Sequence, residues 1–121
     1  MILVDTSIWI DHLNRGDAVL SERLEQGRVL MHPCVLGELA MGSLRQREEI
    51  LEALGDLPRA EVATDAEVLR FVRDETLYGV GIGYVDAQLL AAVRLTRDAR
   101  LWTRDKRLLV VAERMGMAVR D

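Results

Sequence analysis

The chain has 121 residues, of which half are hydrophobic and only 4% aromatic, and its formal net charge is −4. This length suits one domain with an ordinary, mostly aliphatic core, and the acidic total argues against a protein that coats nucleic acid. The single Cys34 excludes an internal disulfide, and no uncharged run approaches the about 20 apolar residues that cross a bilayer. Because residues 1–10 also lack a basic start and a cleavage site, we expect no membrane association and one cytoplasmic domain spanning residues 1–121.

The first half of the chain predicts two strands, each followed by helices. Ile2-Leu3-Val4 is a continuous apolar run, typical of a parallel strand buried on both faces, and residues 28–32 indicate a second strand. Residues 5–7 supply capping side chains for a first helix that runs to about Asn14. Caps, glycine stops and amphipathic spacing predict further helices over residues 18–26, 33–41 and 43–54.

The second half continues this alternation. Thr64 and Glu67 form a capping-box pattern, and residues 78–83 are a glycine-rich break. The expected helices cover residues 64–77, 84–96 and 105–115. The expected strands are a weak one at residues 60–63, a clear one at 100–103 and a last short one at 118–119. Strands that alternate with helices predict an α/β fold with a mainly parallel sheet.

Three carboxylates stand alone in apolar sequence. Asp5 is the only charged residue among the first ten, Glu38 the only one in residues 29–44, and Asp86 the only one in residues 76–93. At the charge content of the whole chain, 30%, the last window would hold about five charges by chance. A buried carboxylate is costly unless it is paired or bound to a cation, so three such acids suggest a shared metal ion.

A fourth acid, Asp105, joins them by position. Asp5 directly follows the first strand and Asp105 follows the strand that ends at Thr103, and ligands of parallel sheets bind beyond the carboxyl ends of strands. Each acid also has a purely structural interpretation. Asp5 and Asp105 suit helix N-caps, Asp86 suits the dipole of a helix start, and Glu38 suits a solvent-exposed face. Taken together, the four acids favour the metal site.

The chemistry of the donors indicates which metal is expected. Ligation by carboxylate oxygens suits Mg²⁺ or Mn²⁺, whereas zinc prefers imidazole and thiolate. His12, His32 and Cys34 are too few and too scattered for a zinc site. A carboxylate-held Mg²⁺ orients a phosphate, lowers the pKa of a bound water and stabilises the leaving oxygen, which is the chemistry of phosphodiester hydrolysis.

Four segments carry a resemblance to a known family: VDTSIWID, the Glu of LGELAMG, GYVDAQLLAA and WTRDKRL. In this order and at this length, the chain resembles the PIN-domain ribonucleases, in particular the VapC toxins of bacterial and archaeal toxin–antitoxin pairs. The resemblance implies a Rossmann-like three-layer α/β/α sandwich and a homodimer. It also implies a metal site made of Asp5, Glu38, Asp86 and Asp105, with polar support from Thr6 or Ser7 and from Thr103.

We therefore expect a Mg²⁺-dependent endoribonuclease, with Mn²⁺ as a possible alternative ion, that acts as the toxin of such a pair. Asp5 and Asp86 are the expected main ligands, and Glu38 and Asp105 complete the site or orient the attacking water. Some PIN domains carry a further acid where this chain has Arg107, so a fully ligated second metal is not implied.

Basic residues and an inhibitor complete this interpretation. Arg104, Lys106 and Arg107 are candidate phosphate contacts, and their alternative is a solvated helix start. A toxin needs an inhibitor, and we expect an antitoxin whose C-terminal tail places an Arg beside the carboxylates. Its apolar residues are expected to lie near Trp9 and residues 44–54.

Two other functions remain open from the sequence. A non-catalytic binding module on the same fold would be expected to lack one or more of the four acids, and all four are present. Another metal-dependent phosphoester hydrolase, or a receiver-like phosphoacceptor, is the second alternative. A receiver needs paired acids after its first strand, and here only Asp5 follows that strand.

Overall fold

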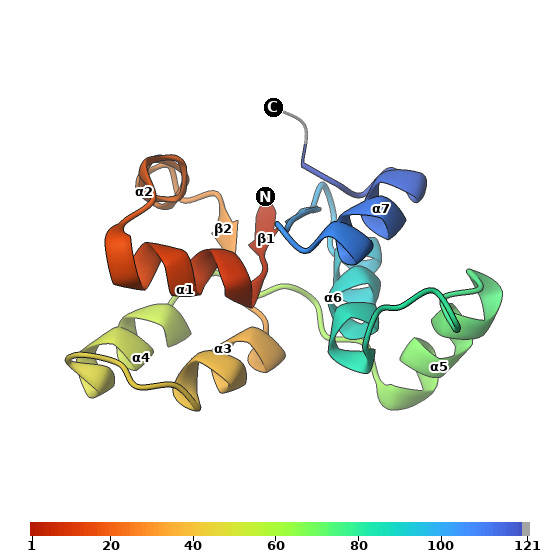
Figure 1. Ribbon diagram of the computed structural model, residues 1–121, viewed down its shortest axis with the longest axis horizontal. Coiled ribbons are helices and arrows are strands. Elements are labelled where there is room, and N and C mark those ends of the chain that lie inside the picture. The colour runs from red at the N-terminus through yellow and green to blue at the C-terminus, as the bar shows by residue number, and fades with distance from the viewer. Residues whose placement is uncertain (120–121) are drawn as a thin grey trace.

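A short parallel sheet runs through the middle of the molecule, and helices cover both of its faces (Figure 1). The structure is a computed structural model, and it describes residues 1–119. The strands are β1 (Ile2–Val4), β2 (Val29–Leu30) and β3 (Arg100–Trp102). The helices are α1 (Thr6–Arg15), α2 (Ala18–Glu25), α3 (Pro33–Ala40), α4 (Arg47–Gly55), α5 (Asp65–Asp74), α6 (Tyr84–Leu95) and α7 (Lys106–Arg114).

The strand order is β2-β1-β3, and both pairs are parallel. The register pairs Leu3 with Leu30 on one side and with Leu101 on the other, so β1 is the central strand. Helices α1 to α4 lie on one side of the sheet and α5 to α7 on the other (Figure 1). The α/β/α sandwich expected from the sequence is therefore confirmed.

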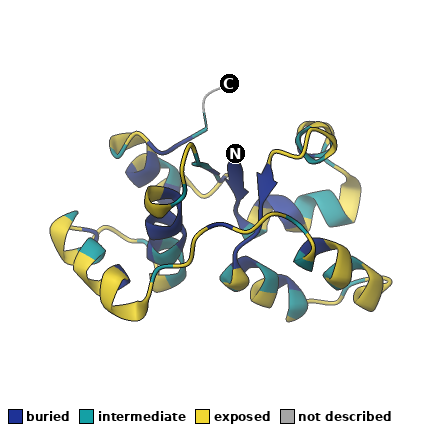
Figure 2. Cartoon of the chain, turned by 180° about the vertical axis from the view of Figure 1, so that it is seen from behind, coloured by how far each residue is buried: buried dark blue, intermediate teal, exposed yellow. Residues whose placement is uncertain are grey.

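The apolar sequence of β1 matches its position in the hydrophobic core. Its three side chains are buried, because helices cover both faces of the strand. Helix α6 lies between β3 and α5, and its apolar run from Leu89 to Val93 is buried. Buried residues gather at the sheet and on the inner faces of the helices, and exposed residues lie on the outer faces (Figure 2). No helix within residues 1–119 has the length and apolar character that a bilayer crossing requires.

Two expected strands are wrong in extent. Residues 60–63 are not a strand: the parallel pairing with Met31 is a single bridge at Arg59, and after it the backbone N–H of Glu61 donates to the hydroxyl of Thr96 at 2.8 Å. The last expected strand is reduced to one bridge, between Leu101 and Ala118.

Two expected helices are shorter than their patterns. The helix expected from residue 43 begins only at Arg47, since Gln46 before it adopts a left-handed backbone with φ 50°. The helix expected to reach residue 77 ends at Asp74, and Thr76 has a φ of 53°. In both cases a positive φ at a non-glycine residue prevents the helix from continuing.

Candidate metal centre

The parallel arrangement of β1 and β3 brings Asp5 and Asp105 to the same edge of the sheet. The backbone N–H of Asp5 donates to the carbonyl of Trp102 at 2.9 Å, so the two strands end together. Asp5 is the N-cap of α1 and Asp105 is the N-cap of α7. The capping role proposed as a structural alternative is therefore real, and it coexists with the position expected for a ligand site.

Asp5 is held in place by three hydrogen bonds. It is only 9% exposed, and its Oδ2 accepts from the hydroxyls of Thr103 at 2.8 Å and of Ser7 at 3.2 Å. Its Oδ1 accepts from the backbone N–H of Thr6 at 2.8 Å. The Thr103 hydroxyl in turn accepts from the backbone N–H of Asp105 at 3.1 Å. The expected polar helpers thus connect the first and last acids.

Glu38 comes to the same region from α3. The residue is exposed, but its Oε1 accepts a hydrogen bond of 2.6 Å from the hydroxyl of Thr6, at the start of α1. The side chain therefore does not simply extend into solvent. Thr6 and Ser7 both contribute, one to Glu38 and the other to Asp5.

Asp86 lies in the first turn of α6, where its Oδ2 accepts from the backbone N–H of Gly83 at 3.0 Å. Burial raises the pKa of this carboxyl above its ordinary value, and the hydrogen bond from Gly83 acts in the opposite direction. The negative charges of Asp5, Asp105 and Glu38 raise the pKa of Asp86 further. The other three acids are therefore close enough to Asp86 for their charges to act on it.

In the part of the chain that the structure describes, no basic side chain compensates this charge. Within residues 1–119, no arginine or lysine forms an ion pair with any of the four carboxylates. Arg104, next to Asp105 in the chain, pairs instead with Asp11 at 3.0 Å and with Asp17 at 2.5 Å. These ion pairs engage its guanidinium, and its expected role as a phosphate contact stays a prediction.

The donors fit a hard divalent cation such as Mg²⁺ or Mn²⁺ in their chemistry, since all are carboxylates that lack a compensating charge. Within the described residues, however, no three His, Cys, Asp or Glu side chains converge closely enough to hold an ion as they stand. Helix capping accounts for part of this: Asp105 Oδ1, for example, accepts from the backbone N–H of Leu108 at 3.0 Å. Glu38, Asp86 and Asp105 each keep a second oxygen that accepts no hydrogen bond within residues 1–119.

Sequence reasoning missed one contact that lies close to this centre. The thiol of Cys34 donates to the amide oxygen of Gln88 at 2.8 Å and so joins α3 to α6, the helices that carry Glu38 and Asp86. Burial, and next the charge of Glu38, raise the pKa of the Cys34 thiol, which keeps it protonated as a donor. The only sequence signal was the spacing of Cys34 four residues before Glu38 and of Gln88 two residues after Asp86.

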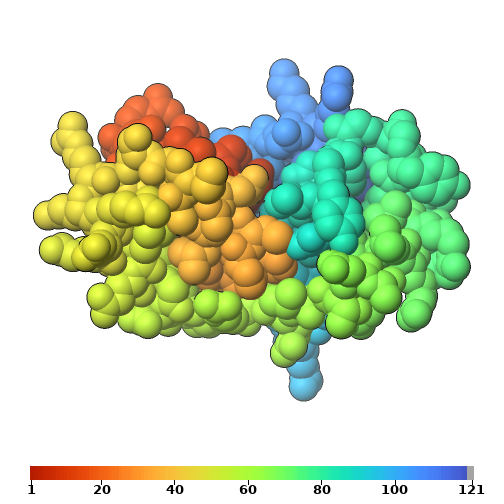
Figure 3. Space-filling model, turned by 90° about the horizontal axis from the view of Figure 1, so that it is seen from below, coloured from red at the N-terminus to blue at the C-terminus, as the bar shows by residue number. Residues whose placement is uncertain are grey.

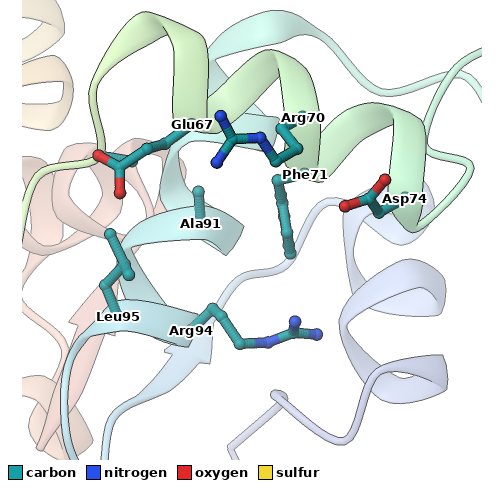
Figure 4. A pocket seen from close by; sticks show the side chains of 8 residues that line it. Glu67, Arg70, Phe71, Asp74, Ala91, Arg94 and Leu95 are labelled. Carbon is teal, nitrogen blue, oxygen red and sulfur yellow. The ribbon is translucent and has the colours of Figure 1, made fainter.

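A separate hollow lies between α5 and α6 (Figure 4). Its volume is about 210 Å³, and none of the four acids lines it. Its wall contains Phe71, and the guanidinium of Arg94 lies 5.2 Å from the centre of that ring. This hollow is apolar with charged residues at its edge, and it offers no cluster of metal-binding oxygens.

Comparison with known proteins agrees with the fold. The model of the PIN domain family matches residues 2–114, and the chain belongs to this family. Two relatives from Mycobacterium tuberculosis, strains CDC 1551 / Oshkosh and ATCC 25618 / H37Rv, both bear the name Ribonuclease VapC32. Each is 49% identical to this chain over 121 residues, which are 100% of this chain and 98% of the relative. The resemblance to VapC-type PIN ribonucleases is confirmed.

Proposed function

We propose that this protein is a metal-dependent endoribonuclease that acts as the toxin of a VapBC-type toxin–antitoxin pair. Its family and its 49% identity to relatives named as ribonucleases of the VapC type support this function. The observation that carries the metal site is the raised pKa of Asp86, caused by burial and by three neighbouring acids without a cation among them. Such a site attracts a divalent cation from solution.

In this proposal, Asp5 and Asp86 are the main ligands, and Glu38 and Asp105 complete the site or orient the attacking water. Bound Mg²⁺, or Mn²⁺, supplies the positive charge that orients the scissile phosphate and lowers the pKa of the attacking water. The hydrogen bonds of Thr103 and Ser7 fix the orientation of Asp5, and that of Thr6 directs Glu38 toward α1. Lys106, in the first turn of α7, is an exposed candidate for a phosphate contact.

A chelation experiment tests this function. The purified protein is incubated with a mixed RNA substrate in Mg²⁺, in Mn²⁺ and in EDTA. We expect cleavage with either metal and none in EDTA. Undiminished cleavage in EDTA would exclude the metal-dependent mechanism. RNA binding without cleavage under every condition would favour the binding module, and hydrolysis of simple phosphoesters without RNA cleavage would favour another hydrolase.

We further propose that a cognate antitoxin occupies a groove between α1, α3 and the loop that joins α3 to α4. The groove has a volume of about 220 Å³, and Ile10, Leu13, Leu44 and Glu38 are among the residues that line it. A peptide in this groove places its apolar side chains on the leucines and an arginine beside Glu38. The apolar contacts of the antitoxin are expected near Trp9, but the side chain of Trp9 is itself only 1% exposed and offers them no surface. Its neighbour Ile10, 47% exposed, takes that place.

Measurements of inhibition and of affinity distinguish the two parts of this contact, the arginine beside Glu38 and the apolar side chains in the groove. Replacing the arginine in the tail of the antitoxin should relieve inhibition more than it weakens the complex, because the apolar contacts remain. Replacing Ile10 with Ser on the toxin should weaken the complex and leave cleavage by the free toxin unchanged. Equal losses of affinity and inhibition for the arginine variant would contradict this arrangement.

We also propose that the protein is a homodimer that acts on RNA in the cytoplasm. Leu69 and Leu95, 62% and 46% exposed, are large apolar side chains on α5 and α6 that a second copy can cover. Sedimentation of the wild type and of a Leu69→Ser variant tests the dimer. A monomeric wild type at micromolar concentration would contradict it.

A further inference from the structure

The side chain of Arg107 rests on a glycine in the loop that leads into α6. A Cβ atom built on Gly81 would lie 2.9 Å from Cδ of Arg107 and 3.2 Å from its Nη1. Real Cβ atoms almost never approach another atom this closely, so any larger residue at position 81 would displace the arginine. Gly81 therefore provides the surface on which Arg107 lies.

The other glycine in this loop with a positive φ makes no such contact. Gly79 has a φ of +71° and Gly81 a φ of +87°, so both adopt a backbone that favours glycine. A Cβ atom on Gly79, however, would meet nothing within 4 Å. The backbone conformation alone accounts for Gly79, whereas Gly81 must also leave room for Arg107.

The guanidinium of Arg107 has no carboxylate partner within residues 1–119. Arg104, one turn earlier, is held by two aspartates and lies 5.7 Å from the ring of Trp102. The donors of Arg107 thus remain available to a ligand from solution. A planar guanidinium fixed on a backbone surface suits a bidentate contact to a phosphate.

The position of this contact links it to the acidic centre from two directions. Arg107 follows Asp105 by two residues, and Gly81 precedes Gly83, the residue that donates to Asp86, by two residues. Figure 1 shows the first turn of α7 beside the loop between α5 and α6. In Figure 3 the start of α6 and helix α3 lie next to each other in the middle of the molecule. An RNA strand that crosses between them would pass the acidic centre and Arg107.

We propose that Gly81 positions Arg107 to bind a phosphate of the RNA strand that flanks the scissile one. This inference rests on the proposed ribonuclease function. Four carboxylates repel a phosphodiester backbone, and an arginine held at their edge gives the strand a favourable contact there. Because the arginine side chain already lies against the backbone of the loop, less of its freedom is lost when the phosphate binds.

Salt-dependent RNA binding in EDTA tests this role without cleavage. A fluorescent single-stranded RNA is titrated with protein at several salt concentrations. We expect Arg107→Ala to weaken binding about tenfold. We also expect it to reduce the slope of log K against log salt by about 0.7, the value for one phosphate contact on a single strand. Arg104→Ala should leave the slope unchanged, because that guanidinium is already paired.

A pair of glycine variants tests the positioning itself. Gly81→Ala should weaken RNA binding and reduce the slope, whereas Gly79→Ala, with the same backbone preference but open space, should not. In an Arg107→Ala background, Gly81→Ala should have no further effect on RNA binding beyond that of Gly79→Ala. If Gly81→Ala does not fold, the salt slope of Arg107→Ala decides alone.

The outcomes of these experiments show which part of the proposal is wrong. If the wild type binds and cleaves RNA but Arg107→Ala keeps its full slope, the role of Arg107 is excluded and the ribonuclease function stands. Equal effects of Gly81→Ala and Gly79→Ala would exclude the positioning by Gly81. A wild type that neither binds nor cleaves RNA overturns this inference together with the proposed function.

Discussion

The connection from β3 to α7 touches two groups of carboxylates: Arg104 pairs with the first group, and the next residue, Asp105, belongs to the second. Among the described residues, only the first group has an arginine as its partner. Asp11 and Asp17 share Arg104, whereas Asp5, Glu38, Asp86 and Asp105 have no basic partner within residues 1–119. In the first group, ion pairing lowers the pKa of Asp17; in the second, burial and mutual repulsion raise that of Asp86. The difference distinguishes acids that pair within the fold from acids that we propose to bind an external cation.

The largest expected effect is on catalysis. Asp86→Asn keeps the shape of the side chain and an acceptor for Gly83, but it removes the charge that a metal needs. RNA cleavage should fall by orders of magnitude. Glu67→Gln is the matched control, because Glu67 makes the same capping contact at the third position of α5, to the N–H of Thr64. Similar activities of the two variants would remove the distinction between the two kinds of acid.

Arg104→Ala should affect stability and not catalysis. The variant removes the ion pairs with Asp11 and Asp17, of which Asp11 keeps its other ion pair with Arg15, and it removes the contact with the ring of Trp102. We expect a loss of about 1 kcal/mol, or roughly 4 °C in the melting temperature of a domain of this size. Thermal unfolding and an RNA cleavage assay measure both effects. A variant of unchanged stability that cleaves RNA much more slowly would place Arg104 in the catalytic site after all.

Without metal, neutralising Asp86 should stabilise the protein. Its folded-state pKa is raised, so the charged form is unfavourable in the native state at neutral pH, and Asp86→Asn should raise the melting temperature in EDTA by roughly 2 °C. Glu67→Gln should lower the melting temperature, because the hydrogen bonds to Thr64 favour the charged form of Glu67. The same sign of change for both variants would argue against repulsion among the four acids.

The expectation for Asp5 differs from that for Asp86. Asp5→Ala removes the acceptor for Thr6, Ser7 and Thr103. This loss opposes any relief of repulsion, so a lower stability of Asp5→Ala does not distinguish a cap from a ligand. Asp86 is the more informative position for measurements of stability.

The smallest expected effect is on the pH dependence of stability in the acid range. Arg104 holds the pKa of Asp17 below its ordinary 3.8. The charged Asp17 therefore contributes its full share to the free energy of unfolding above the pKa of the unfolded state, and this share is lost as the pH falls through the pKa of the folded state. In Asp17→Asn, the melting temperature should therefore depend less steeply on pH below about pH 4. Melting curves of wild type and variant across that range provide the comparison, and parallel curves would contradict the proposed role of Arg104.

Local patterns predicted the parts of the fold and site that depend on local chemistry. The buried strand β1, the caps at Asp5 and Asp105, and the lone acids Glu38 and Asp86 were all recognisable from neighbouring residues. The ion pairs of Arg104 and the burial of Trp9 could not be predicted in this way, because they depend on distant residues. Arg104 pairs with aspartates 93 and 87 residues away, and no local pattern reveals that partner choice.

Metal binding by calorimetry tests the distinction between the two groups most directly. Mn²⁺ is titrated into metal-free wild type, Asp86→Asn, Asp17→Asn and Glu67→Gln, and each protein is also melted with and without the ion. We expect the wild type, Asp17→Asn and Glu67→Gln to bind Mn²⁺ equally and to melt at a higher temperature with it. Asp86→Asn should lose both effects. No binding by the wild type, or equal binding by Asp86→Asn, would show that the four carboxylates are not a metal site.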